Sequence, residues 1–131
     1  MSNYQAPLRD MRFVIHELVE SGPICALPGY ADCDAGLIDA VLEEAARFAG
    51  DVLSPLIPVV DRDGARWLAG TDGKGEVRTA AGFADAYTQF AEGGWMALPC
   101  PPDYGGQGLP RLLAVAGSEM WKSGNPSCSQ V

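Results

Sequence analysis

The thiol and imidazole side chains of this sequence, which can bind zinc or act as nucleophiles, are few. They are the four cysteines, Cys25, Cys33, Cys100 and Cys128, and the single histidine, His16. A structural zinc site usually needs four well-spaced ligands, and no two of these cysteines form a C-x-x-C pair. We therefore expect no metal centre in this chain.

His16 begins the segment His16-Glu17-Leu18-Val19-Glu20, which differs by one residue from the helix motif of zinc metalloproteases. That motif places two histidines four residues apart so that both imidazoles reach one metal, with the glutamate as base. Here Glu20 replaces the second histidine. Its carboxylate could ligate zinc, but the sequence supplies no evident third ligand. The pattern favours a half-exposed histidine on a helix surface beside acidic neighbours.

Two acidic segments resemble calcium loops only superficially. They are Asp61-x-Asp63-Gly64 and Asp72-Gly73-x-Gly75-Glu76. An EF-hand loop places its oxygen ligands at fixed positions around a central glycine and ends in a bidentate glutamate. Neither segment keeps that spacing, so solvated, turn-forming loops are favoured.

The glycine-rich run Gly105-Gly106-Gln107-Gly108 invites comparison with a phosphate-binding loop. Such loops follow a strand and open a helix, often with Lys and Ser or Thr after the glycines. No strand is indicated before this run, and no lysine follows at the needed offset. Pro99, Pro101 and Pro102 precede it, and none of them fits inside a regular helix or ladder. A structural connector of defined shape is favoured.

Cys100 and Tyr104 lie in the same connector. No cationic side chain or histidine stands near Cys100 in the sequence to activate its thiol, so an inert thiol is favoured. A tyrosine in a Pro/Gly corner usually buries its ring and pairs its hydroxyl with the backbone, which predicts a folding role for Tyr104. Trp95 and Trp121 flank the connector and are expected in the core.

Two amphipathic helices are expected in the first half of the chain. Pro7 suits the first turn of a helix that ends at Gly22-Pro23, and its apolar stripe consists of Leu8, Met11, Ile15, Leu18 and Val19. Asp34 is expected to cap the second helix, whose wide apolar stripe reaches Val52. Pro55 and Pro58 should then end or kink it.

The second half predicts two more helices after a loop. Residues 61–78 read as an exposed loop with a short extended segment at 66–68. Thr79 is the expected cap of a third helix closed by Gly93-Gly94, and Pro110 opens the fourth. In the fourth helix, small residues such as Gly117 would let another helix approach closely. The expected fold class is therefore all-α, a small bundle of about four helices with long Gly/Pro-rich connectors.

Length and charge narrow the function further. A chain of 131 residues predicts one domain. Its net charge of −8 gives a surface that repels phosphate backbones, which argues against nucleic acid as a partner. The longest apolar runs are too short to cross a bilayer, and the N-terminus lacks the charged and apolar regions of a secretory signal. We expect a cytoplasmic protein without a membrane partner.

Four separated motifs together resemble the N-terminal domain of the acyl-CoA dehydrogenase family, of the long bacterial type that includes the 3-methylmercaptopropionyl-CoA dehydrogenase-like branch. They cover roughly residues 4–125. The motifs are Tyr4-Gln5-Ala6-Pro7-Leu8-Arg9-Asp10-Met11-Arg12-Phe13, Phe48-Ala49-Gly50-Asp51-Val52-Leu53-Ser54-Pro55-Leu56 with Asp61-Arg62-Asp63-Gly64, Gly82-Phe83 to Gly93-Gly94-Trp95, and the proline, acidic residue and Tyr104-Gly105-Gly106-x-Gly108 of the connector.

This resemblance implies an α domain at 1–125 and a divergent tail at 126–131, where Pro126 should interrupt the expected helix. The hypothesis is a truncation or a reading-frame change near residue 125. In the family, FAD accepts a hydride from an acyl-CoA thioester while a carboxylate removes the α-proton. The domains that supply both lie beyond this chain. The resemblance therefore implies no catalytic or cofactor-binding residue here, no FAD bound by this chain alone and no activity alone. It places the connector near the mouth of the acyl cavity, which gives Tyr104 a role at the substrate edge.

Two other interpretations remain open. The chain could be a stand-alone helical adaptor or a partner subunit that completes a split acyl-CoA dehydrogenase. The alkylation-response branch of the same superfamily associates with nucleic acid, which conflicts with the charge of −8. In the family this domain packs against the other two, so the resemblance implies that part of the fourth helix keeps an uncovered apolar surface here. Such a surface favours homo-oligomers or association with chains carrying the missing domains.

Overall fold

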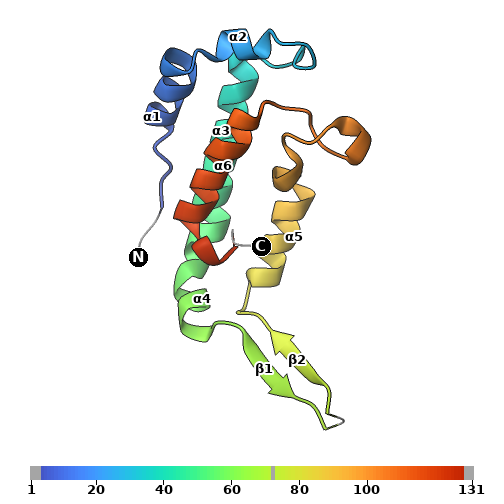
Figure 1. Ribbon diagram of the computed structural model, residues 1–131. Helices are drawn as coiled ribbons and strands as arrows, with labels where there is room; N and C mark the ends of the chain where they lie inside the picture. Colours follow the sequence, from blue (N-terminus) through green and yellow to red (C-terminus); the bar gives the residue numbers. More distant parts are fainter. Residues whose placement is uncertain (1–3, 72, 129–131) are drawn as a thin grey trace.

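Helices dominate the computed structural model, which describes residues 4–71 and 73–128. In Figure 1, α1, α3, α5 and α6 lie alongside one another and a two-stranded hairpin extends beyond them. This arrangement confirms an all-α protein with one small β element. The α-helices and strands are α1 Leu8–Phe13, α2 Ser21–Cys25, α3 Ala35–Phe48, α4 Ile57–Asp63, β1 Arg66–Ala69, β2 Gly75–Arg78, α5 Phe83–Glu92 and α6 Arg111–Gly124.

The first helical stretch changes its hydrogen-bonding pattern after α1. Residues Val14–Leu18 form a π-helical turn, and Met11 and Ile15 are buried. A π turn takes in an extra residue, so it rotates the positions that follow it around the helix axis. Leu18 is consequently 66% exposed and Val19 47% exposed. The expectation that these two residues point inward is therefore wrong.

The first helix also ends earlier than expected. Glu20 adopts φ 55°, the one positive φ of a non-glycine residue in the described part of the chain. The chain turns there, so Gly22 and Pro23 do not end the first helix. They lie instead inside the short helix α2.

The second helix confirms its expected cap. The Asp34 side chain accepts a hydrogen bond of 2.7 Å from the Leu37 N–H at the start of α3. The stripe behind it buries Ile38, Leu42 and Ala45.

The helical path does not end at Pro55 or Pro58. It passes through a π turn (Ala49–Leu53) and a 3₁₀ turn (Ser54–Leu56) into α4. The prolines coincide with these changes because each lacks the N–H that a regular helix would use. Figure 1 shows α3 and α4 as one bent helical path.

Residues 61–78 are not simply a loop. Positions 61–63 belong to α4, and β1 pairs antiparallel with β2 in the register Trp67 opposite Val77. A Cβ on Gly75 would lie 1.7 Å from Trp67 Cζ2, so the indole occupies the space over this glycine. Both strands are largely exposed. The expected extended segment at 66–68 is confirmed as β1, but burial gives no period-two signal here, so the second strand and the pairing were not predicted.

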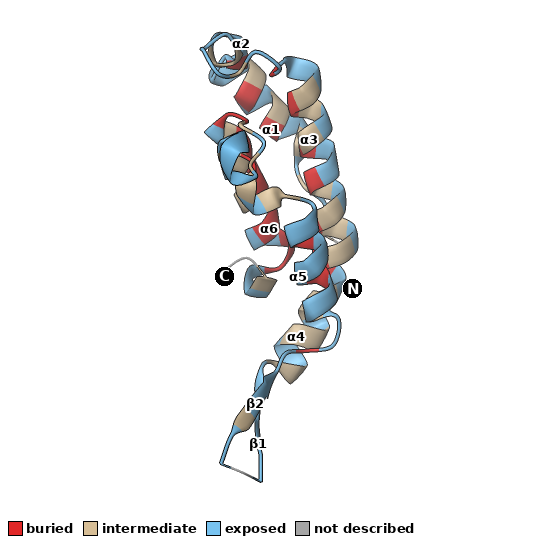
Figure 2. Cartoon of the chain, turned by 90° about the vertical axis from the view of Figure 1, so that its right-hand side faces the viewer, coloured by how far each residue is buried: buried red, intermediate tan, exposed pale blue. Residues whose placement is uncertain are grey.

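The third helix begins later than expected, so Thr79 is not its cap. Gly82 stands at the N-cap position with φ 82°, and α5 starts at Phe83. The bundle core forms where the four main helices face one another, as the buried segments in Figure 2 show. Trp121 meets Phe48 and Phe90 edge to face, with ring centroids 5.7 and 5.4 Å apart.

Trp95 lies beside Trp121 with a centroid distance of 5.1 Å, so the expectation that both tryptophans pack in the core is confirmed. The close backbone approach of α6 involves Gly124 rather than Gly117. A Cβ on Gly124 would lie 3.1 Å from the Ala49 carbonyl oxygen, whereas one on Gly117 would meet Trp121 of its own helix.

None of the helices within residues 4–71 and 73–128 combines the length and the apolar character that crossing a lipid bilayer requires.

Candidate functional site

The Pro/Gly corner, residues 94–110, joins α5 to α6 and folds back on itself. Its glycine-rich end donates backbone hydrogen bonds to its own beginning. Gln107 N–H donates to the Ala97 carbonyl at 3.2 Å, Gly108 N–H to Cys100 at 2.8 Å, and Leu109 N–H to Leu98 at 2.9 Å. These bonds confirm a connector of defined shape.

The amides before these are also engaged within the corner. Gly105 N–H donates to the Pro102 carbonyl at 2.9 Å, and Gly106 N–H to the Pro101 carbonyl at 3.2 Å. A phosphate cradle needs several free amides that converge on one anion. All four amides of residues 105–108 already have carbonyl partners. The corner therefore does not fit the pyrophosphate of a dinucleotide such as FAD.

Glycine is required at Gly106 for a steric reason. A Cβ there would lie 2.0 Å from the Cys100 carbonyl oxygen. Gly105 and Gly108 adopt φ 79° and φ 63°, which side-chain-bearing residues disfavour. Leu98, Leu109 and Pro110 are buried, so both ends of the corner are anchored in the core.

Tyr104 lies at the tip of this corner, at the end of the 3₁₀ turn Pro102–Tyr104. Its side chain is 85% exposed. The expectation of a buried ring in a folding role is wrong, because the turn directs residue 104 outward and Gly105 then returns the chain to the body. The corner projects from the helices in Figure 1. A role at a substrate edge stays a prediction.

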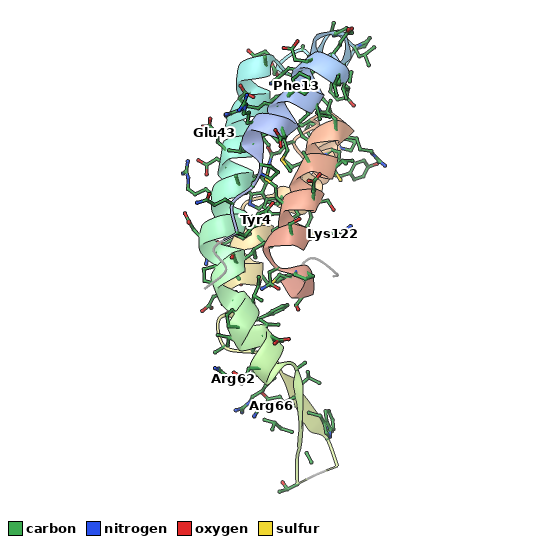
Figure 3. The ribbon with its side chains drawn as sticks, turned by 90° about the vertical axis from the view of Figure 1, so that its left-hand side faces the viewer. Tyr4, Phe13, Glu43, Arg62, Arg66 and Lys122 are labelled. Carbon is green, nitrogen blue, oxygen red and sulfur yellow. The ribbon has the colours of Figure 1, made fainter. Side chains whose placement is uncertain are left out.

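The outward face of α6 borders two hollowed surfaces. A groove of about 520 Å³ separates the first helical stretch from α6, lined by apolar residues that include Met11, Val14, Ile15 and Leu112. Val115 is 65% exposed and borders both this groove and a shallow depression around Arg111 and Lys122. Figure 3 shows this side, with Phe13 on α1 above and Lys122 on α6 below.

The groove combines an apolar floor with acidic side chains. Asp10 and Glu119 both line it, and both are exposed. The expected uncovered apolar surface on the fourth helix is thus present, and it extends onto the first helical stretch. An exposed apolar patch of this kind marks a surface that another protein segment can cover.

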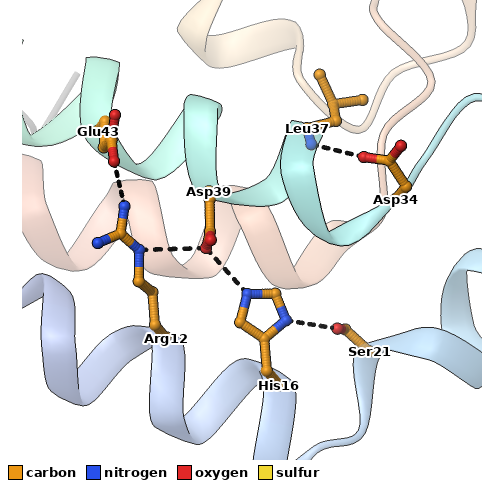
Figure 4. A network of polar contacts seen from close by, with 7 residues as sticks. All are labelled: Arg12, His16, Ser21, Asp34, Leu37, Asp39 and Glu43. Atoms are coloured by element: carbon orange, nitrogen blue, oxygen red, sulfur yellow. Dashed lines mark hydrogen bonds and ion pairs between the residues drawn. The ribbon is translucent and has the colours of Figure 1, made fainter.

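A polar network fixes the first helical stretch to α3 (Figure 4). His16 Nε2 lies 2.9 Å from Asp39 Oδ1, and His16 Nδ1 lies 3.0 Å from Ser21 Oγ. Arg12 Nε donates to the same Asp39 oxygen at 3.2 Å, and the Arg12 guanidinium also pairs with Glu43. The hydrogen bond from His16, aided by the charge of Arg12, lowers the pKa of Asp39.

Both ring nitrogens of His16 therefore have protein partners, and the ring is partly buried. The interpretation of His16 as a structural helix-surface residue beside acidic groups fits this geometry. Within the described residues, no group of three or more His, Cys, Asp or Glu side chains is arranged to hold a metal ion. Asp63 instead accepts ion pairs from Arg62 and Arg66, which lower its pKa. Asp72 lies outside the described residues.

Sequence reasoning missed the polar anchor at the end of α6. Asn125 is 1% exposed, and its side chain donates to the Leu53 carbonyl at 3.1 Å and accepts from the Ser127 N–H at 3.1 Å. Its contact with Leu53 spans 72 positions of sequence, so no local pattern could reveal it. Asn125 ends the helix, and Pro126–Cys128 continue as a 3₁₀ turn, which confirms the expected interruption at Pro126.

A second anchor of this kind lies at the other end of the chain. The Tyr4 N–H donates to Ser54 Oγ at 3.1 Å, and Ser54 is buried. Burial raises the pKa of the Tyr4 hydroxyl, partly offset by its hydrogen bond with Ser123. The segment before α1 is thereby tied to the 3₁₀ turn Ser54–Leu56 and to α6. The acyl-CoA dehydrogenase-like motif at 4–13 begins at this anchored residue.

In its described part the chain forms a helical bundle with an ordered Pro/Gly corner, and sequence comparison relates it to known proteins. No protein-family model matches the chain. The chain is 36% identical over 124 residues to 3-methylmercaptopropionyl-CoA dehydrogenase from Ruegeria pomeroyi. The aligned region covers 95% of this chain and 20% of that protein. The resemblance to acyl-CoA dehydrogenases is thereby confirmed. The chain spans about one fifth of its relative, which is consistent with an N-terminal domain.

Proposed function

We propose that this chain is the N-terminal helical domain of an FAD-dependent acyl-CoA dehydrogenase and forms one wall of an acyl-CoA site completed by other domains. The observation that carries this proposal is the extent of the similarity. It includes 95% of this chain and only 20% of the relative. A chain that matches one fifth of the relative would supply one wall of an active site rather than the whole site.

The surface of the domain supports this proposal. The groove beside α6 and the exposed Val115 provide an apolar face that the remaining domains could cover. Tyr104 stands 85% exposed on a corner anchored at both ends, so it could reach a substrate held between domains. The amides of residues 105–108 are all paired with carbonyl groups, so the glycine-rich run offers no free backbone donor to FAD. In this proposal FAD and the catalytic carboxylate belong to the other domains, the location is the cytoplasm, and the chain alone binds no FAD and has no activity.

Complementation tests this proposal directly. The relative would be expressed without the fifth that matches this chain, with and without the chain in trans. We expect the chain to restore FAD retention and acyl-CoA-dependent reduction of an electron acceptor, and to show neither alone. Flavin absorbance and turnover with the chain alone would overturn the proposal that FAD and the catalytic carboxylate belong to the other domains.

A matched pair of variants locates the contact. Val115→Glu introduces a charge on the outward face of α6, where glutamate is a good helix former. Val77→Glu places the same charge on the hairpin at nearly equal exposure, 63% against 65%. We expect Val115→Glu to reduce complementation at least tenfold and Val77→Glu to leave it within twofold. Equal effects would argue against α6 as the contact.

The alternative is a stand-alone adaptor or partner subunit that completes a split enzyme. In that case the apolar face beside α6 would contact the separate chain that carries the other domains. Purification from the source organism distinguishes the two: a separate chain carrying FAD would co-purify with the adaptor, whereas a domain would be recovered within one longer polypeptide.

A further inference from the structure

Cys25 and Cys33 are brought into contact by the connector between α2 and α3. Cys25 is the last residue of α2. The chain then turns twice, with the Tyr30 N–H donating to the Leu27 carbonyl at 3.1 Å and the Cys33 N–H to the Tyr30 carbonyl at 2.9 Å. The two sulfur atoms consequently lie 2.8 Å apart.

We propose that Cys25 and Cys33 form a redox pair that closes to an intramolecular disulfide when the protein meets a hydroperoxide. A disulfide bond is about 2.05 Å long, so the sulfurs need to approach by less than about 1 Å. This inference is independent of the proposed dehydrogenase function and goes beyond it.

The two thiols differ in access, which assigns their roles. Cys33 is 8% exposed, and burial, together with its hydrogen bond to Cys25, raises its pKa to about 12. Its thiol stays protonated at neutral pH. Cys25 is only partly buried, so it is the thiol that a dissolved peroxide reaches first. Reactivity toward peroxide requires the thiolate form and access.

The chemistry proceeds in two balanced steps. The Cys25 thiolate attacks one oxygen of hydrogen peroxide, the O–O bond breaks, and Cys25 sulfenic acid forms with release of one water after proton transfer. The Cys33 sulfur then attacks the Cys25 sulfur, and the hydroxyl leaves as a second water with the Cys33 proton. Overall the two thiols lose two electrons and two protons, and the peroxide is reduced to two waters.

The bond would join the end of α2 to the residue that precedes the α3 cap. It would close the connector that carries Leu27, which is 53% exposed. Oxidation would thus restrict the connector between α2 and α3 at one end of the bundle. The thiols Cys100 and Cys128 lie on other elements, in the corner and in the turn after α6.

Peptide mapping tests the pair on the full-length chain. Trypsin should release Phe13–Arg47, which holds both Cys25 and Cys33, while Cys100 and Cys128 fall in separate peptides. After treatment of dilute folded protein with hydrogen peroxide and blocking of free thiols, we expect this peptide to have lost two hydrogens and to carry no thiol label. Reduction before blocking should restore two labels on it.

Variants separate the pair from general thiol oxidation. In Cys33→Ser, Cys25 should be trapped by dimedone as sulfenic acid, and no peptide disulfide should form. In the matched control, Cys100→Ser combined with Cys128→Ser, disulfide formation should proceed within twofold of the wild-type rate. Circular dichroism checks that each variant is folded, and Cys33→Ala offers a second form of the same test.

Three outcomes would overturn the inference. The first is full labelling of the Phe13–Arg47 peptide under conditions that oxidise Cys100 or Cys128. The second is oxidation of Cys25 to sulfinic acid in the wild-type protein without a disulfide. The third is a disulfide that links Cys25 or Cys33 to another cysteine or to a second molecule.

Discussion

Replacement of Gly106 by alanine should destabilise the protein through a single steric conflict in the Pro/Gly corner. The added Cβ would lie 2.0 Å from the carbonyl oxygen of Cys100 and 2.4 Å from its carbonyl carbon. Both are backbone atoms, and the same Cys100 carbonyl accepts the Gly108 N–H, so the conflict cannot be relieved by rotating a side chain. Forced overpacking costs about 1–3 kcal/mol. Alanine also restricts the unfolded chain more than glycine does, and this effect stabilises the folded state by about 0.4–1 kcal/mol.

A backbone contact of 2.0 Å places the conflict toward the upper end of that range, so the net loss is about 2 kcal/mol. For a chain of this length the unfolding entropy converts 1 kcal/mol into about 4 °C, so we expect a drop in Tm of about 8 °C. Thermal unfolding followed by circular dichroism at 222 nm measures it. Gly22→Ala is the matched control, because a Cβ at Gly22 meets no atom within 4 Å and that glycine lies in helix α2.

The control should melt at or slightly above the wild-type temperature, since alanine favours a helix over glycine by about 1 kcal/mol. If the Tm of Gly106→Ala equalled that of Gly22→Ala, the reasoning would be refuted. The corner would then relax around a Cβ, and its shape could not hold Tyr104 in one position.

Two further predictions concern the polar anchors. Asp39→Asn should lower the free energy of unfolding by about 0.5 kcal/mol at pH 6, a small value because solvent screens the partly exposed pair. The pKa of Asp39 is lowered in the folded state, so its contribution is present above the unfolded value and is lost as the pH falls through the folded one. Urea unfolding of both proteins should thus show the difference vanishing toward pH 2, and a difference that grows in acid would contradict this assignment. Asn125→Asp keeps the shape and the acceptor for the Ser127 N–H but removes the donor to the Leu53 carbonyl and buries a carboxylate. It should cost at least about 2 kcal/mol at pH 7 by urea unfolding, and wild-type stability would show that this hydrogen bond is not formed in solution.

Local patterns predicted the helices that have an apolar stripe and a clear boundary. The Asp34 cap is confirmed because an aspartate side chain and the N–H three residues later meet within one turn. The buried positions of α3 follow from helical spacing alone. The interruption at Pro126 also follows from chemistry within one residue. Such features need no knowledge of the rest of the chain.

Local patterns failed where packing between distant segments decides the outcome. The π turn at Val14–Leu18 rotates Leu18 and Val19 outward, and apolar spacing alone cannot signal that change of register. The extended segment at 66–68 was predicted, but its pairing with residues 75–78 was not, because both faces of the hairpin are exposed. Gly82 begins α5 in place of Thr79 because the chain must turn there from the hairpin toward the bundle.

In the candidate site, too, some features followed from the sequence and others only from the tertiary structure. Its proline and glycine composition determined that residues 94–110 form a rigid corner, because those residue types restrict or extend the backbone by themselves. Only the tertiary structure decided that Tyr104 faces outward, that Asn125 reaches Leu53 and that the Cys25 and Cys33 sulfurs touch. Sequence determines what each segment can form alone, whereas the direction of a side chain depends on which neighbours exclude it from the space around it.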